Sequence, residues 1–130
     1  MDRIPEDFRY LLAPETKAYA YLATTLRDGS PQVTPVWFAV EGGHILINSK
    51  KGRSKDANMR RRPQVALAIA DPVFPNRYIQ LRGEVVEIFD DETLIQRLSQ
   101  LYTGKPFNVR PGDVRVTYKI LPSKITVYSW

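Results

Sequence analysis

Residues 20–38, AYLATTLRDGSPQVTPVWF, contain two strand patterns on either side of a turn signal. The alternation in the first half predicts a strand from Ala18 to Leu26. Asp28-Gly29 is a strong hairpin signal, and the second half predicts a return strand from Pro31 to Val40. Pro35 lies inside the return strand. Because proline has no N–H to give to a neighbour, this strand is expected at a sheet edge or beside a gap.

The rest of the chain continues with strands and short connections. A diglycine turn at 42–43 precedes further strands, predicted at 44–49, 64–70, 78–88 and 114–121, with a continuation over 124–128. Gly83 predicts a bend or bulge within its strand. Short helices are predicted at 5–12, from a Ser54 cap to about Arg62, and from an Asp90 cap to about Tyr102. A row of alanines, Ala66, Ala68 and Ala70, lets another layer approach closely.

These elements amount to six or seven strands and two or three short helices, and they predict a mainly β protein. Because most successive strands are joined by hairpins, the sheet is expected to be mostly antiparallel. A small closed or split β-barrel with peripheral helices fits better than a sandwich. With 130 residues and no visible repeat or linker, residues 1–130 are predicted to form a single domain. Dimerisation would help a core of this size.

Composition excludes several kinds of chemistry. The chain has no cysteine and one histidine, His44, which rules out disulfides, a cysteine nucleophile and a multi-histidine metal site. There is no Gly-x-Gly-x-x-Gly motif, Walker A motif or visible catalytic triad. We therefore assign no catalytic residue and no metal ligand, and expect any chemistry to come from a bound cofactor. No apolar run approaches the roughly 18 residues of a membrane helix, and no signal peptide is visible, so a cytoplasmic protein without a membrane span is expected.

The net charge of +5 comes from one segment. Residues 50–62 contain seven basic residues and one acid, Asp56, so they carry +6, while the other 117 residues sum to −1. The segment follows a strand, turns at Gly52 and opens a helix, and a helix N-terminus favours phosphate. Lys55, Asn58, Met59 and Arg62 are expected on one face of that helix. From the residues alone, this segment is either a phosphate site or a solvated basic helix.

Two further segments could contact a ligand. Gln32 and Thr34 project from one face of the proline-interrupted strand, where a planar heterocycle could read backbone donors and acceptors. The alternative is a packed Trp37 and Phe38 core with an edge proline. The second segment, Asn76-Arg77-Tyr78, offers an amide, a guanidinium and a ring, or is ordinary loop polarity.

The order of these segments resembles a known family. Residues 20–38 look like the opening of the pyridoxamine 5′-phosphate oxidase-like flavoproteins, which have the FMN-binding split β-barrel fold, and most closely like the deazaflavin branch that uses coenzyme F420. Four later segments agree in kind and order, so the resemblance spans roughly residues 4–121. They are Gly52–Arg61, Pro63–Leu67, Asp71-Pro72 with Arg77-Tyr78 and Leu81-Arg82-Gly83, and Tyr102–Lys105.

The resemblance implies a homodimer with two cofactor sites at the subunit interface, and it implies three groups of site residues. The first group contacts the ring of the cofactor: Gln32, Val33, Thr34 and Pro35, with Trp37 nearby. The second group binds the phosphate: Asn48, Ser49, Lys50, Arg53, Lys55, Asn58 and Met59. The third group comes from the other subunit and closes over the ring: Asn76, Arg77 and Tyr78.

The leading hypothesis is an oxidoreductase that transfers a hydride between coenzyme F420 and a small organic substrate. An FMN-dependent oxidoreductase of the same fold and a flavin or F420 carrier without turnover are the alternatives. A nucleic-acid-binding barrel is disfavoured, because residues 50–62 contain no aromatic side chain and single-strand binders usually combine cations with aromatics.

Overall fold

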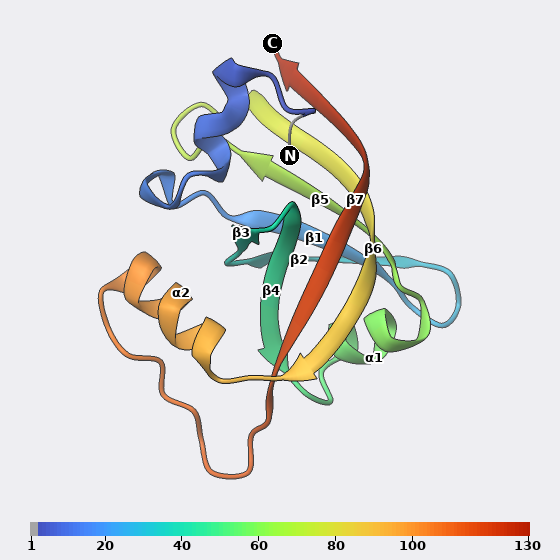
Figure 1. Ribbon diagram of the computed structural model, residues 1–130. Coiled ribbons are helices and arrows are strands. Elements are labelled where there is room, and N and C mark those ends of the chain that lie inside the picture. Colours follow the sequence, from blue (N-terminus) through green and yellow to red (C-terminus); the bar gives the residue numbers. More distant parts are fainter. Residues whose placement is uncertain (1–2) are drawn as a thin grey trace.

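The computed structural model of the protein describes residues 3–130 and is built on one curved antiparallel sheet (Figure 1). Within this range the sheet has seven strands in the order β2-β1-β5-β6-β7-β4-β3. The strands are β1 (Ala20–Thr25), β2 (Pro31–Val36), β3 (Ala39–Glu41), β4 (His44–Lys50), β5 (Gln64–Ala70), β6 (Arg77–Asp90) and β7 (Arg115–Ser129). The two edge strands, β2 and β3, follow one another in the chain. This arrangement confirms the mainly β, antiparallel split barrel.

The β1–β2 hairpin forms as predicted, with Ala20 opposite Val36 and Thr25 opposite Pro31. Because β2 is an edge strand, Pro35 removes no ladder hydrogen bond from a second neighbour. The prediction of one strand from Pro31 to Val40 is wrong, since β2 ends at Val36 and β3 begins at Ala39. The break lets the chain cross from one sheet edge to the other.

The core fills the inside of the curved sheet. The alternation in β5 places Val65, Leu67 and Ile69 inside, while the alanines between them stay half-buried on the outer face. A second, smaller apolar cluster forms where Leu94 and Leu98 pack on Leu46. These contacts place a helix beside β3 and β4, next to the end of β4 that bears the basic segment.

The helices are α1 (Ser54–Arg61) and α2 (Thr93–Thr103), and the shorter N-terminal segments Glu6–Leu12 and Pro14–Thr16 are 3₁₀ helices. Two predicted caps are wrong. Arg53 occupies the N-cap position of α1, and no side chain caps it. At α2, Asp91 rather than Asp90 accepts hydrogen bonds from the backbone N–H groups of Thr93 and Leu94, at 3.0 and 3.2 Å.

Strand β7 is longer than predicted, because it runs through Pro122 without interruption. Gly83 lies opposite Pro122, and the register of β6 against β7 shifts between Arg82 and Gly83. This shift confirms the predicted bulge. A Cβ atom at Gly83 would lie 2.7 Å from the carbonyl oxygen of Leu121.

Gly83→Ala is expected to lower the free energy of unfolding by about 1–3 kcal/mol, the usual cost of overpacking. The added methyl group meets a backbone carbonyl, which cannot rotate away as a side chain can. Urea denaturation at neutral pH measures the change. Glu84→Ala, at an exposed neighbouring position, is the control and should cost much less. Equal stability of Gly83→Ala and the wild type would contradict this packing.

Candidate functional site

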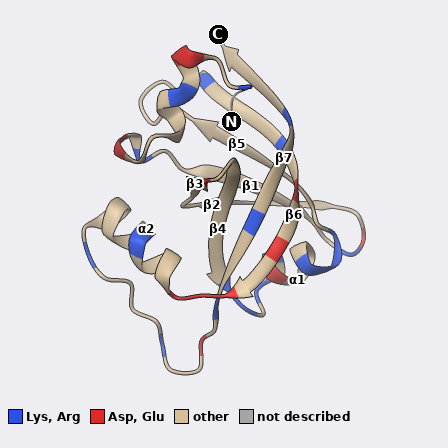
Figure 2. Ribbon diagram, in the orientation of Figure 1, with Lys and Arg blue, Asp and Glu red and all other residues tan. Residues whose placement is uncertain are grey.

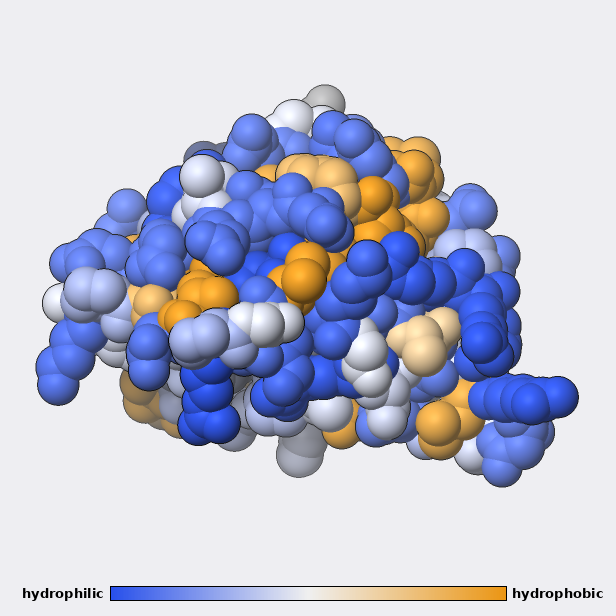
Figure 3. All heavy atoms as spheres, turned by 90° about the horizontal axis from the view of Figure 1, so that it is seen from below, coloured by the Kyte–Doolittle hydropathy of each residue, from blue (hydrophilic) through white to orange (hydrophobic). Residues whose placement is uncertain are grey.

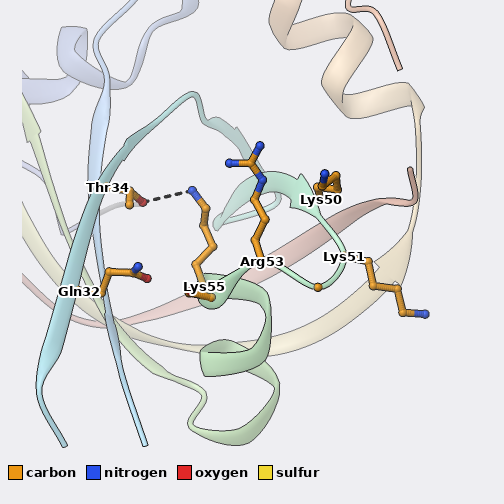
Figure 4. A pocket seen from close by; sticks show the side chains of 8 residues that line it. Gln32, Thr34, Lys50, Lys51, Arg53 and Lys55 are labelled. Atoms are coloured by element: carbon orange, nitrogen blue, oxygen red, sulfur yellow. Dashed lines mark hydrogen bonds between the residues drawn. The ribbon is translucent and has the colours of Figure 1, made fainter. Parts of the chain in front are cut away.

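A cavity of about 540 Å³ opens between β2 and the turn that joins β4 to α1. Figure 4 shows the side chains that line it. The cavity is lined by Gln32, Thr34, Lys50, Lys51, Gly52, Arg53, Ser54 and Lys55. Four of these described lining residues are cations, and none is an acid. Lys and Arg also gather around this turn and α1 in Figure 2. The cavity therefore suits an anion.

Lys55 is the cation that is aimed across the cavity. Its Nζ donates to Thr34 Oγ1 on β2 at 3.3 Å (Figure 4). Burial lowers the pKa of Lys55, and the nearby charges of Arg53 and Arg115 lower it further. Lys50 pairs with Asp113 at 3.6 Å, but Lys55, Arg53 and Arg115 have no ion pair among the described residues, and a bound anion would stabilise these like charges. The positive charge here therefore favours the binding of an anionic ligand.

Gln32 carries an unsatisfied polar atom at the same cavity. Its Oε1 is buried and has no hydrogen-bond partner among the described residues. Buried side-chain oxygens are nearly always hydrogen-bonded in native proteins. A ligand N–H or O–H group in the cavity would satisfy this acceptor, so the cavity fits a polar ring as well as a phosphate.

The turn itself is held by the carboxylate of Asp56, which is 3% exposed. Asp56 accepts hydrogen bonds from the backbone N–H of Gly52 at 3.0 Å, from Tyr118 Oη at 2.5 Å and from Arg60 Nε at 2.9 Å. Burial raises the pKa of Asp56, but these hydrogen bonds outweigh it and lower the pKa overall. Gly52 has φ +94°, a left-handed conformation that glycine adopts without strain. The shape of the basic turn therefore depends on an ionised, buried carboxylate.

A second, smaller recess of about 220 Å³ adjoins the first, because Arg53 and Lys55 line both. Its other walls are mainly aromatic and apolar, with Arg115 and the end of β4 at one side. The remaining lining residues are Tyr19, Pro35, Val36, Trp37, Asn48, Ser49, Ile95, Leu98, Phe107 and Arg115. Trp37 stacks on Tyr102, with ring centroids 5.2 Å apart and planes 10° apart. A cationic cavity thus continues into a ring-lined one.

The structure brings together many of the residues predicted from the sequence. Gln32, Thr34, Lys50, Arg53 and Lys55 share the larger cavity. Four others line the recess, namely Pro35, Trp37, Asn48 and Ser49. Val33 points to the opposite face of β2, as strand alternation requires.

Asn58 and Met59 are not at the cavity. They are buried, at 4% and 1% exposed. Asn58 Nδ2 donates to Thr24 Oγ1 at 3.0 Å, and its Oδ1 accepts from Arg62. The predicted helix face is therefore a packing face, and only Lys55 of that set reaches the cavity.

Asn76, Arg77 and Tyr78 lie apart from both cavities. Arg77 already has partners within its own chain, since its Nη2 donates to the Asp7 carbonyl at 2.9 Å and its guanidinium lies 4.2 Å from the Phe8 ring centroid. Asn76 Nδ2 donates to the carbonyl of Trp130. The ring of Tyr78 stacks on Tyr128 at 5.0 Å and borders a shallow groove on the outer face of the sheet. Within one chain, these three residues do not close the site.

Sequence reasoning missed Arg115, Phe107 and the α2 residues Ile95 and Leu98. Arg115 enters the site because it lies opposite Lys50 in the β4–β7 ladder, and this long-range register left no local signal.

Seen from the side of α1 and the loop after α2, the surface is mostly hydrophilic with separate hydrophobic areas (Figure 3). No helix within residues 3–130 has the length and apolar character to cross a bilayer.

The sequence model of the pyridoxamine 5′-phosphate oxidase family matches residues 5–124, and the chain therefore belongs to this family. Among solved structures, it is similar to a protein named F420 reductase, with 33% identity, 95% of this chain and 98% of that chain covered, and a TM-score of 0.84.

More distant structures share the fold. A conserved hypothetical protein from Mycobacterium tuberculosis is 23% identical, with 97% and 86% covered and a TM-score of 0.73. A putative pyridoxamine 5′-phosphate oxidase from Listeria innocua is 21% identical, with 94% and 98% covered and a TM-score of 0.67. No curated protein matches the sequence.

Proposed function

We propose that this protein is an oxidoreductase that transfers a hydride between coenzyme F420 and a small organic substrate. The observation that carries the proposal is the larger cavity, where the cations Arg53 and Lys55 lie beside the unsatisfied acceptor Gln32 Oε1. A phosphate next to a planar ring is the chemistry of such a cofactor. The similarity to a protein named F420 reductase supports F420 over FMN.

The residues of this chain then bind and orient. Arg53 and Lys55 bind the phosphate, and the first turn of α1, from Ser54, presents backbone N–H groups that have no partner within the helix. The buried Gln32 Oε1 accepts a hydrogen bond from the ring. As an edge strand, β2 also offers backbone groups without a strand partner on one side. When bound, reduced F420 would supply the hydride and be oxidised as the substrate is reduced, so the chain itself needs no catalytic side chain.

The test is an anaerobic titration of the purified protein with F420 and with FMN, followed by absorbance. F420 is expected to bind at micromolar concentration or below. If neither ligand binds in that range, the proposal fails. If FMN binds and F420 does not, the protein is an FMN-dependent oxidoreductase.

Turnover separates the enzyme from a carrier. The enzyme should reoxidise bound reduced F420 faster than free solution does with at least one member of a panel of quinones, enones and tetrapyrroles. Tight binding without such acceleration would identify a carrier. The cytoplasmic location predicted from the sequence stays a prediction.

We further propose that the protein is a homodimer through the outer face of β1, β2, β5 and β6. Val33 and Tyr21 are 61% and 46% exposed on this face. They border a shallow groove of about 290 Å³ with Ala66, Ala68 and Tyr78. The small alanines let a second sheet approach closely. A second copy seated there carries its own residues 76–78 toward β2, where they would close over the ring.

Val33→Asp is expected to give a monomer, because it buries an unpaired carboxylate in an apolar interface. Light scattering after gel filtration measures the mass of both forms at equal concentration. Since Val33 is exposed in the single chain, folding should change little. Val86→Asp is the matched control: Val86 is 48% exposed and lies outside the groove. A monomeric wild type, or a dimeric Val33→Asp variant, would refute the interface.

A further inference from the structure

Arg115 is the one cation of the recess that the proposed phosphate site does not use. It lies at the start of β7 and lines the smaller recess but not the larger cavity. Aromatic and aliphatic side chains, among them Trp37, Ile95 and Leu98, line the same recess. A half-buried guanidinium beside such walls suits a ligand that carries both a negative charge and an apolar ring.

The guanidinium is held in place by its neighbours. Arg115 Nε donates to Asn48 Oδ1 at 2.9 Å, and its central carbon lies 4.8 Å from the Phe107 ring centroid. Asn48 is itself fixed, because its Nδ2 donates to Thr117 Oγ1 at 3.0 Å and to the Asp91 carbonyl at 3.2 Å. Arg115 is therefore oriented before any ligand arrives.

The outer donors of Arg115 have no acceptor. In the part of the chain that the structure describes, neither Nη1 nor Nη2 makes a hydrogen bond or an ion pair within 4.0 Å. The nearby carboxylate of Asp113 instead pairs with Lys50, at 3.6 Å. Burial lowers the pKa of Arg115, and the charge of Arg53 lowers it further, while the charge of Asp113 acts in the opposite direction. The recess thus holds an oriented cation whose two outer nitrogens have no partner among the described residues.

We propose that Arg115 binds the carboxylate of a flat, ring-bearing substrate in this recess. Two in-plane N–H donors match the two oxygens of a carboxylate, and the aromatic walls match the ring. About 220 Å³ is below the roughly 300–1,000 Å³ typical of sites for drug-sized ligands, so one or two fused rings fit. That this ligand is the substrate rests on the proposed function, because the recess adjoins the cofactor cavity.

The test uses a matched pair of probes, 2-naphthoate and its neutral amide, 2-naphthamide, titrated calorimetrically into the protein with and without saturating cofactor. The wild type should bind naphthoate about tenfold or more tightly than naphthamide, the usual effect of a charge-assisted hydrogen bond. Arg115→Gln should remove this difference. Arg110→Gln removes the same charge from an exposed position outside the recess and should leave it intact.

Several outcomes overturn the proposal. Equal binding of the two probes to the wild type does so, as does an unchanged naphthoate affinity in Arg115→Gln. Competition between naphthoate and the cofactor also does so, since it assigns the recess to the cofactor. If Arg115→Gln does not fold, Arg115→Lys takes its place and should bind naphthoate less tightly than the wild type, because lysine offers no planar pair of donors. The titration without cofactor tests whether Arg115 binds the carboxylate even if neither F420 nor FMN binds.

Discussion

Lys55→Ala is expected to weaken the binding of F420 roughly 10- to 150-fold, which corresponds to about 1.5–3 kcal/mol for one charge-assisted hydrogen bond. Lys55 is expected to contribute this much to binding because it is half-buried and its Nζ crosses the cavity, 3.3 Å from Thr34 Oγ1. A cation in a partly dehydrated cavity interacts with an anion more strongly than an exposed one does. Arg53→Ala should lower the affinity in the same direction.

Lys55→Ala should not lower the stability of the ligand-free protein, although it lowers the affinity for the cofactor. Burial and the charges of Arg53 and Arg115 lower the pKa of Lys55, so the charged form is disfavoured in the folded protein without ligand. Lys55→Ala removes that repulsion and should leave the stability of the ligand-free protein unchanged or raise it. A variant that loses affinity without losing stability identifies a residue kept for binding.

The measurement is a cofactor titration paired with urea denaturation of the ligand-free protein. Lys124→Ala is the control, because Lys124 is exposed and lines neither the cavity nor the recess. Raised salt should weaken wild-type binding more than that of Lys55→Ala, since one fewer charge contributes. Unchanged dissociation constants in both Lys55→Ala and Arg53→Ala would exclude this cavity as the phosphate site.

The fold was predictable where local signals decide it. The Asp28-Gly29 turn, the proline in β2 and the glycine in β6 each constrain the backbone within a few residues, and the structure confirms the hairpin, the edge and the bulge. The break at residues 37–38 was not predictable in this way. The apolar pattern continues through it, and the partner on which Trp37 stacks there, Tyr102, is distant in the sequence.

The candidate site was also predictable only where local signals mark its residues. The basic turn and β2 are neighbours in the fold, and each carries its own sequence signal. Arg115 and Tyr118 come from β7, and they meet the turn only through the β4–β7 ladder. Asp56 looked like one acid among seven cations, although its carboxylate is the group that the turn is built around. A single sequence gives the type of each residue but not its partners at long range.

Asp56→Ala is expected to lower the free energy of unfolding by about 3–5 kcal/mol, the usual cost of removing one partner from a buried, charged network. It leaves Tyr118 Oη without its acceptor in a site where Tyr118 is fully buried. It also frees the backbone N–H of Gly52 from the bond that holds the turn. Affinity for a phosphate ligand should therefore fall together with stability, in contrast to Lys55→Ala.

Asp56→Asn separates the charge from the shape, and its effect depends on pH. The folded pKa of Asp56 is lowered, so its ionised form stabilises the fold above the unfolded pKa of about 3.9, and this stability is lost as the pH falls through the folded value. The difference in unfolding free energy between the wild type and Asp56→Asn should be largest near neutral pH and should shrink below about pH 4. Urea denaturation across this range measures it, with the exposed Asp90→Asn as the control. A difference that does not change with pH would show that the fold does not depend on the charge of Asp56.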